Sequence, residues 1–344
     1  MTSVDALPRP AADRKADHLR IAAGQGVLHA SGTGLDAVRL RHRALPERDL
    51  DDVSLACDLL GARLGAPLIV SAMTGGTSAA ELVNARLARA AAEHGIAMAL
   101  GSGRALLDDP GLVPTYLGEV RPPLLLANLG GVELAGPGGP ERAAALVELL
   151  GADGLSVHLN PVQEAVQPEG DPVFSGVLAA IAATVLRLEP LPVIVKEVGF
   201  GMDGEDVRLL AEAGVAAVDV AGAGGTNWAL VEGRRDPRAG AVAGAFGGWG
   251  VPTASALRAA RAAAPGLPLL ASGGIRDGVE AAKCLALGAV AVGMARPLLQ
   301  AAQADRVDEA LRVFLDQLRI ATWAAGASAS AALAGAHLQG TASP

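Results

Sequence analysis

From residue 67 onward, eight short apolar runs alternate with longer segments of helical period. This alternation is typical of parallel strands joined by crossover helices. The expected strands are 67–73, 96–102, 124–130, 154–160, 192–199, 217–222, 268–274 and 290–295. The intervening helices are rich in alanine, as in ELVNARLARAAAEHG and EDVRLLAEAG. Eight such pairs over about 250 residues predict an α/β fold, a closed (β/α)₈ TIM barrel.

An open, doubly wound sheet is the alternative fold for this pattern. It is disfavoured because no GxGxxG turn follows the first expected strand, where a dinucleotide-binding loop would lie. The barrel hypothesis divides the chain into an N-terminal extension over residues 1–66, a barrel over 67–333 and a disordered tail over 334–344.

Composition limits the partners of such a barrel. A net charge of −8 and an aromatic content of 2% argue against nucleic acid, which needs a basic face or stacking platforms. Cys57 and Cys284 are too few for a disulfide framework, and we expect both as buried thiols in helical surroundings. No apolar leader and no run of about 20 apolar residues is present, so we expect a cytoplasmic protein without membrane contact.

The residues that end each strand are more polar than the strand bodies. In a (β/α)₈ barrel the chemistry lies at the carboxyl ends of the strands, so these residues should share one cavity. The strand ends are 71–76, 101–104, Asn128, 158–160, 196–197, 222–226, 272–276 and 293–296.

Two glycine-rich loops, SGGIR at 272–276 and GMARP at 293–297, follow the seventh and eighth strands. Barrels build phosphate sites at this place from main-chain N–H groups, and Arg276 or Arg296 would add a charged contact. The alternative is that these glycines only form tight turns.

Lys196 ends the fifth strand and should project into the barrel mouth. A desolvated lysine there could be a Schiff-base nucleophile or the counter-charge of an anionic cofactor ring. The alternative is a lysine that extends to solvent at the rim beside Glu197.

The segment HLNPVQEAVQPEGDPVF, residues 158–174, gathers hydrogen-bonding groups after the fourth strand. His158, Asn160 and Gln163 are polar and Glu164 is charged, a combination that suits Mg²⁺ beside a diphosphate. Alternatively, Glu164 opens a helix and compensates its dipole. Zinc is disfavoured because His158 has no second histidine or cysteine at ligand spacing.

Two further segments are candidates for the surroundings of the cavity. Arg14, Lys15 and His18 form a cationic cluster before the barrel, which by itself indicates a solvated patch. The glycine-rich stretch 221–250 contains Trp228 and is long enough to cover the site as a lid.

Together these residues resemble the FMN-dependent type II isopentenyl-diphosphate isomerases, from about Arg14 to the last barrel helix. The resemblance rests on several separate motifs. They are RKADH (14–18), ALPE (44–47), SAMTGG (71–76), GSGR (101–104), ANLG (127–130), residues 158–174, VKEVGFGM (195–202), AGAGGTNW (221–228) and SGGIRDGVEAAKCLALGA (272–289).

The resemblance implies the interconversion of isopentenyl and dimethylallyl diphosphate in isoprenoid biosynthesis, with FMN kept reduced by NADPH and Mg²⁺ on the diphosphate. It implies that FMN is held by Ala72, Met73, Thr74, Ser102, Asn128, Lys196, Thr226, Gly274, Ile275, Arg276, Ala295 and Arg296. It places Arg14, Lys15, His18, Arg104, His158, Asn160 and Gln163 at the substrate. It gives catalytic roles to Gln163, Lys196 and His158, makes Glu164 the metal ligand, and implies a homo-oligomer, a tetramer or an octamer.

The chain departs from the family pattern at three positions. Ala221 and Asn227 stand where serines are usual, so a polar FMN contact is in doubt, and Gly103 replaces a longer side chain. The rival functions are an FMN oxidoreductase of the 2-hydroxy-acid oxidase or dihydroorotate dehydrogenase type, and a flavin-binding barrel without catalysis.

Overall fold

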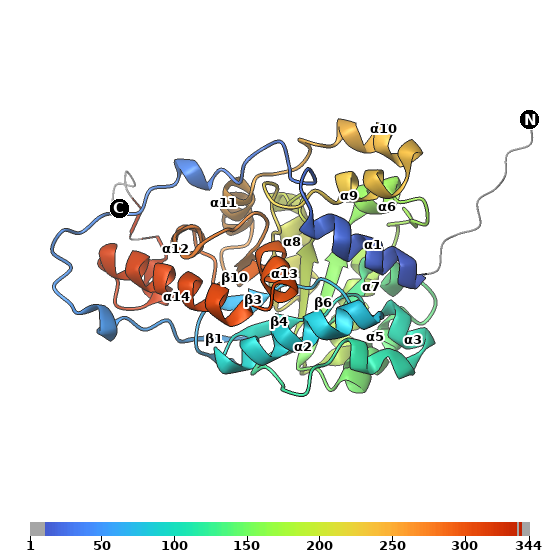
Figure 1. Ribbon diagram of the computed structural model, residues 1–344, viewed down its shortest axis with the longest axis horizontal. Coiled ribbons are helices and arrows are strands. Elements are labelled where there is room, and N and C mark those ends of the chain that lie inside the picture. Colours follow the sequence, from blue (N-terminus) through green and yellow to red (C-terminus); the bar gives the residue numbers. More distant parts are fainter. Residues whose placement is uncertain (1–10, 336, 339–344) are drawn as a thin grey trace, which may run out of the picture.

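The chain folds as a closed barrel of eight parallel strands surrounded by helices (Figure 1). The structure is a computed structural model and describes residues 11–335 and 337–338. Around the barrel the strand order is β10-β3-β4-β5-β6-β7-β8-β9, which is the order along the sequence. The strands are β3 (Leu68–Val70), β4 (Ala97–Ala99), β5 (Leu125–Gly130), β6 (Gly154–Leu159), β7 (Val193–Glu197), β8 (Ala217–Asp219), β9 (Leu269–Ala271) and β10 (Ala291–Met294). The predicted (β/α)₈ barrel is therefore confirmed.

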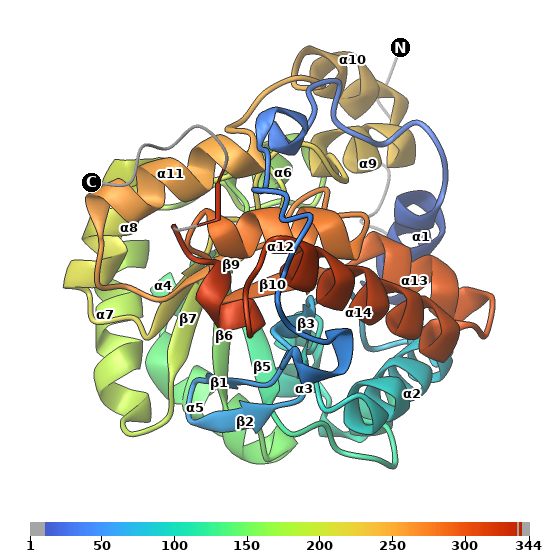
Figure 2. The ribbon, with the colours of Figure 1, turned by 90° about the vertical axis from the view of Figure 1, so that its left-hand side faces the viewer.

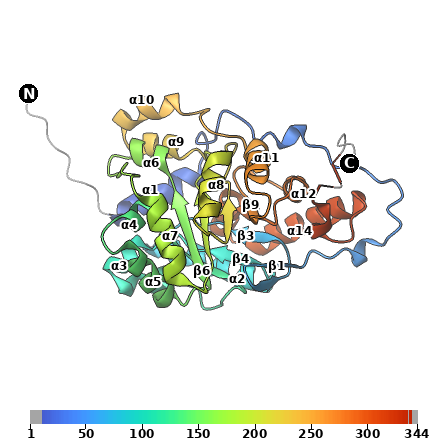
Figure 3. The ribbon, with the colours of Figure 1, turned by 180° about the vertical axis from the view of Figure 1, so that it is seen from behind.

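Helices cover the outside of the barrel, and from behind α7 and α8 lie over its strands (Figure 3). The helices are α1 (Ala11–Ala23), α2 (Ser78–Glu93), α3 (Arg104–Asp108), α4 (Gly131–Ala135), α5 (Gly139–Leu150), α6 (Pro161–Val166), α7 (Val177–Leu188), α8 (Gly204–Glu212), α9 (Trp228–Arg235), α10 (Pro237–Ala245), α11 (Thr253–Ala263), α12 (Gly278–Ala286), α13 (Arg296–Gln303) and α14 (Val307–Ala324). Their ends follow the sequence: Thr77 caps α2 by accepting from Ala80 N, and Gly151 ends α5 at a φ of 54°.

The base of the barrel, at the amino ends of the strands, is closed by a hairpin of β1 (Cys57–Leu59) and β2 (Ala62–Leu64), blue in Figure 2. Leu59 and Leu64 are buried in one apolar cluster with barrel residues such as Leu126 and Leu270. Sequence reasoning missed this hairpin. The expectation of a buried Cys57 in a helical setting is wrong, because Cys57 lies in β1 and is only partly buried. Cys284 is buried in α12, as expected.

The N-terminal segment runs along the outside of the barrel from α1 to the hairpin. On the way it binds the C-terminal end of α14: Arg43 N donates to Ala324 O, and Trp323 Nε1 donates to Arg48 O at 2.6 Å. Of the expected tail, 336 and 339–344 lie outside the described residues, whereas Leu338 bridges to Leu40. Within the described chain, no helix combines the length and the apolarity that crossing a membrane requires.

Candidate active site

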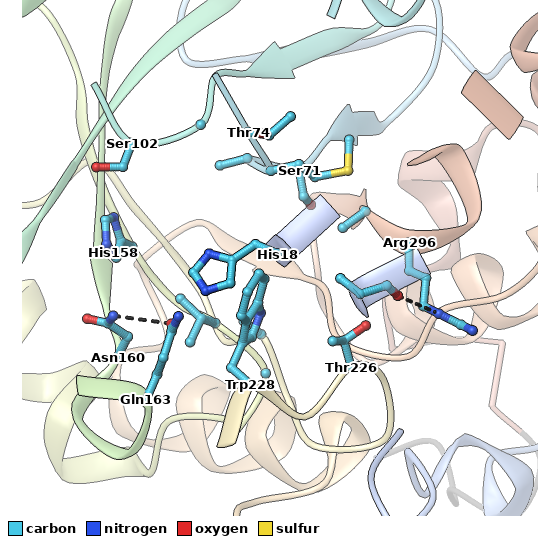
Figure 4. Close-up of a pocket in the computed structure, with 18 of the residues that line it drawn as sticks. His18, Ser71, Thr74, Ser102, His158, Asn160, Gln163, Thr226, Trp228 and Arg296 are labelled. Carbon is cyan, nitrogen blue, oxygen red and sulfur yellow. Dashed lines mark hydrogen bonds between the residues drawn. The ribbon is translucent and has the colours of Figure 1, made fainter. Parts of the chain in front are cut away.

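The carboxyl ends of the barrel strands open into one cavity of about 590 Å³, to which α1 and α9 also contribute (Figure 4). Every residue to which the family resemblance gave a role lines this cavity, whereas the strand-end residues Glu197, Gly222 and Ala223 do not. The residues with a role are Arg14, Lys15, His18, Ala72, Met73, Thr74, Ser102, Arg104, Asn128, His158, Asn160, Gln163, Glu164, Lys196, Thr226, Gly274, Ile275, Arg276, Ala295 and Arg296.

The cavity wall fits FMN. Thr74 Oγ1 and Asn128 Nδ2 are buried and have no protein partner, although both residues line the cavity. A buried polar atom without a partner is costly, so these two atoms are suited to a polar ligand. The loops around Gly225 and Gly274 approach so closely that a Cβ on Gly225 would lie 2.5 Å from Gly274 N. Only glycine permits this approach, which leaves main-chain groups facing a phosphate.

Lys196 lies inside the barrel mouth and does not extend to solvent. It is 8% exposed, and its Nζ donates to the main-chain oxygen of Glu197 at 2.6 Å. Burial lowers the pKa of Lys196, while the carboxylates of Asp219 and Glu197 oppose that shift. The lysine therefore suits the neighbourhood of an anionic group, and the alternative of a rim lysine is wrong.

Two buried carboxyl groups flank Lys196, and sequence reasoning did not give either of them a role. Glu197 accepts from the N–H groups of Gly199 and Gly201, and burial raises its pKa to about 7. Asp219 is the register neighbour of Lys196 and accepts from Ser272 Oγ at 2.8 Å. The signal for Asp219 was a single carboxylate inside an apolar strand.

His158 is held as a neutral imidazole. Its Nδ1 lies 2.9 Å from Asn128 Oδ1, and burial, followed by the charge of Lys196, lowers the pKa of His158 to about 4. At neutral pH this side chain can donate or accept a hydrogen bond but carries no charge.

The structure adds Glu232, which sequence reasoning missed. This carboxylate is fully buried on α9; Gln163 Nε2 donates to Glu232 Oε1 at 2.9 Å, and His18 Nε2 lies 2.8 Å from the same oxygen. Arg235 Nη1 donates to the other oxygen at 2.6 Å, and Arg235 also pairs with Glu169. Burial alone would raise the pKa of Glu232, but its contacts with His18, Gln163 and Arg235 outweigh burial and lower it.

The predicted lid, 221–250, is largely helical and forms α9 and α10. The sequence did contain a signal for Glu232. The spacing of Trp228, Glu232 and Arg235 places all three on one face of a helix. A buried acid beside a buried arginine on that face indicates a site network rather than a solvated surface.

The substrate-binding candidates form a cationic wall. Lys15 Nζ donates to Tyr116 Oη at 2.6 Å, and burial, together with the nearby charge of Arg14, lowers the pKa of Lys15 to about 8. Arg104 is half exposed and contacts Glu133 at 3.3 Å. The basic cluster of α1 is therefore not a solvated patch, because it faces the cavity.

Glu164 lies in the first turn of α6, as expected of a residue that compensates the helix dipole, and it also lines the cavity. Its oxygens accept from Asn160 Nδ2 and from Asp171 N, each at 2.8 Å. Each carboxylate oxygen retains a lone pair for a cation. Among the described residues, no group of three or more histidine, cysteine, aspartate or glutamate side chains is placed to hold a metal. A metal at Glu164 would thus draw its other ligands from amides, substrate and water.

The guanidinium groups expected at the phosphate are engaged elsewhere. Arg276 Nε donates to Glu280 Oε1 at 2.9 Å, and the Arg276 side chain is 67% exposed. Arg296 Nε donates to Ala22 O at 3.0 Å. Both arginines line the cavity, but their guanidinium groups are bonded to protein atoms, so the main-chain N–H groups of the glycine loops are the more available donors for a phosphate.

The three departures from the family pattern have structural settings. Asn227 is buried outside the cavity wall, caps α9 through Leu230 N and donates to Phe246 O at 2.8 Å. Ala221 is buried in the cavity wall. A Cβ on Gly103 would lie 2.6 Å from a methyl carbon of Leu146.

The family model of FMN-dependent dehydrogenases matches residues 11–106 and 177–340. Isopentenyl-diphosphate delta-isomerase of Stutzerimonas stutzeri (strain A1501) is 50% identical, over 94% of this chain and 96% of the relative. The enzyme of the same name from Synechococcus sp. (strain ATCC 27144 / PCC 6301 / SAUG 1402/1) is 48% identical, over 89% of this chain and 90% of the relative.

Solved structures with the same fold are more distant in sequence. A flavocytochrome b2 variant with sulfite bound has a TM-score of 0.66 at 20% identity, covering 95% of this chain and 83% of the other. A mandelate oxidase variant with a monooxide FMN adduct has a TM-score of 0.63 at 22% identity, covering 94% and 92%. These solved structures support the barrel fold, whereas the more similar sequence relatives identify the enzyme family. The chain is thus an FMN-dependent enzyme that belongs to the type II isopentenyl-diphosphate delta-isomerases.

Proposed function

We propose that this enzyme interconverts isopentenyl and dimethylallyl diphosphate in the cytoplasm, with FMN reduced by NADPH as its acid and base and Mg²⁺ on the diphosphate. The observation that carries this proposal is the division of the cavity. Lys196 lies buried at the barrel mouth, whereas Arg14 and Lys15 line the cavity from α1. One part of the cavity is thus suited to an anionic ring and another to a diphosphate.

Moving the double bond requires a proton to be added at one carbon and another to be removed from a second, with positive charge developing on a tertiary carbon between the two steps. Bound reduced FMN supplies the group that exchanges these protons. Lys196 lies in a water-poor site, and as an ammonium it would favour negative charge on a neighbouring ring. His158 is neutral and therefore adds no positive charge beside the developing cation.

The diphosphate is bound by cationic groups and by magnesium. Arg14, Lys15 and His18 from α1 and Arg104 from α3 line this part of the cavity. Glu164 would hold Mg²⁺ between the protein and the diphosphate oxygens. Binding energy from the diphosphate orients the small apolar tail, which itself offers no polar group to the protein.

Gln163 is held in one orientation at the reacting end. Its Nε2 donates to Glu232, while its Oε1 accepts from Asn160 Nδ2 at 3.2 Å. An amide anchored by both of its ends cannot rotate freely, so Gln163 has a fixed hydrogen-bonding pattern toward a substrate.

A homo-oligomer, a tetramer or an octamer, is part of the proposal. Large apolar side chains are exposed on the single chain, with Leu45 at 70% and Trp249 at 59% exposure. Exposed apolar groups of this size are suited to contact with further subunits.

The proposal is tested by incubating the FMN-loaded, reduced protein with isopentenyl diphosphate in D₂O, with and without Mg²⁺. We expect dimethylallyl diphosphate to form and deuterium to enter both isomers. In a parallel incubation with oxidised FMN and no reductant, flavin reduction by the substrate without any isomer would instead indicate an oxidoreductase.

The metal role is tested by Glu164→Ala, which removes the only charged group of the segment 158–164. Turnover that depends on Mg²⁺ should be lost while FMN stays bound, as its visible absorbance reports. Glu148→Ala, on the exposed face of α5, is the matched control and should retain turnover. Full activity of Glu164→Ala would exclude the metal role.

A further inference from the structure

Helix α1 carries three of the proposed diphosphate ligands. It precedes the barrel and is therefore positioned by its contacts with neighbouring helices. Figure 1 shows α1 beside α13, and the two helices are in contact. Apolar side chains on α1, among them Leu19 and Ile21, pack against its neighbours. Apolar packing holds a helix against its neighbours but allows it to slide along its own axis. The polar contacts of α1 are therefore needed to fix its axial position.

The polar contacts of α1 with α13 gather at its C-terminus. Arg296 Nε donates to Ala22 O at 3.0 Å, and Arg296 Nη2 donates to Gly24 O at 2.8 Å. One turn further along α13, Gln300 Nε2 donates to Ala23 O at 2.8 Å. Three successive carbonyl groups are thus bound by two side chains of one neighbouring helix.

These carbonyls are the groups that a helix leaves without internal donors, and they carry the negative end of its dipole. A guanidinium at this place therefore acts as a charged C-terminal cap supplied by another helix. Its forked donors also fix direction, which a single ammonium does less well. Figure 4 shows the Arg296 side chain turned away from His18 and the other labelled side chains of the cavity.

We propose that the Arg296 side chain is a positioning residue that clamps α1, so that Arg14, Lys15 and His18 meet the substrate, and that it is not a ligand of the FMN phosphate. This rests on the proposed role of α1 in diphosphate binding. Because Arg296 is also the first residue of α13 at the cavity wall, one residue joins the cofactor side of the cavity to the substrate helix.

The test compares Arg296→Met, Arg296→Lys and Gln300→Ala in the FMN-loaded enzyme. For Arg296→Met we expect the KM for isopentenyl diphosphate to rise about tenfold, kcat to stay within about twofold, and FMN affinity to stay unchanged. Arg296→Lys should recover part of the loss, because an ammonium still donates to carbonyls. Gln300→Ala should raise KM by about threefold, since it removes one neutral hydrogen bond.

Hydrogen exchange gives a readout that does not depend on turnover. We expect the amides in the last turn of α1 to exchange about tenfold faster in Arg296→Met. Arg312→Met removes an exposed arginine of α14 outside the cavity and should leave every value unchanged. Weakened FMN binding with unchanged α1 exchange would overturn the proposal and make Arg296 a phosphate ligand. Faster α1 exchange with unchanged KM would support the clamp and overturn the diphosphate role of α1.

Discussion

The two ends of the barrel are built from the same eight strands but differ in what they bury. The base is closed by the β1–β2 hairpin and is filled by apolar side chains, among them Leu64, Ile69 and Leu270. The mouth buries ionisable groups, among them Lys196 and Asp219, only two residues after Ile194 and Ala217 of the apolar cluster at the base. Stability should therefore come from the base, and chemistry from the mouth.

The difference has an energetic reason. Each apolar side chain at the base gains free energy on leaving water. A buried charge at the mouth loses hydration, which its partners only partly restore. The mouth is thus the part of the fold that gives up stability for function. Variants at the base should mainly change the free energy of unfolding, and variants at the mouth should mainly change the activity.

The largest effect is expected at the mouth, from Glu232→Gln. The variant keeps the shape of the side chain but removes the charge that holds His18, Gln163 and Arg235. Without this charge Gln163 and His18 lose the group that positions them, and misplacing both should lower kcat/KM by about a thousandfold. Steady-state kinetics measures this, and Glu232→Asp should restore part of the activity.

Glu169→Gln is the matched control, because Glu169 pairs with the same Arg235 but is not bonded to Gln163. We expect it to lower kcat/KM by no more than about tenfold. Equal losses in the two variants would mean that Glu232 serves only to hold Arg235.

The next effect is expected at the base, from Leu64→Ala. Leu64 is 1% exposed, so its truncation leaves a cavity and should lower the free energy of unfolding by about 3 kcal/mol. Urea unfolding measures this, and kcat/KM of the folded protein should stay within about twofold. Leu186→Ala, at a 75% exposed leucine of α7, should leave stability unchanged. A large loss of kcat/KM in Leu64→Ala would break the separation between base and mouth.

The smallest effect is a pH dependence at Lys15. Its pKa in the free enzyme is lowered to about 8, so its positive charge disappears as the pH rises through 8. We therefore expect kcat/KM to fall above pH 8, by at most tenfold per pH unit. Lys15→Arg keeps its charge at that pH and should give a flat profile. An unchanged slope in Lys15→Arg would assign the titration to another group.

The same pKa shift has the opposite sign for stability. In the unfolded chain Lys15 titrates near 10.5, so between pH 8 and 10.5 the unfolded state binds more protons than the folded state. The penalty for burying Lys15 is thus fully present below pH 8 and is relieved as the pH rises toward 10.5. The contribution of Lys15 to the free energy of unfolding should therefore rise over the pH range in which its contribution to substrate binding falls.

The mouth could be predicted from the sequence because parallel strands joined by crossover helices all end on the same side. Lys196 and Asn128 are far apart in the chain, but each ends a strand and so they share one cavity. Glycines such as Gly274 also helped to locate the cavity wall, because two loops that approach closely there leave no room for a side chain.

The direction of individual side chains could not be predicted in this way. Arg296 was expected at a phosphate, yet its partners are carbonyl groups of α1, which lies over 270 residues away in the chain. Glu232 was missed because a charged residue in a short helix is usually solvated, and only its contacts with α1 and α6 bury it. The β1–β2 hairpin was missed because each of its strands has three residues.

The N-terminal segment has a consequence for how the protein is made. Helix α1 docks on α13, and the segment around Arg43 and Arg48 binds α14, so segments made before the barrel strands bind helices that are made after all of them. Until then the apolar face of α1 and the incomplete barrel are exposed and can make non-native contacts. The substrate site can therefore form only after α13 and α14 have been made.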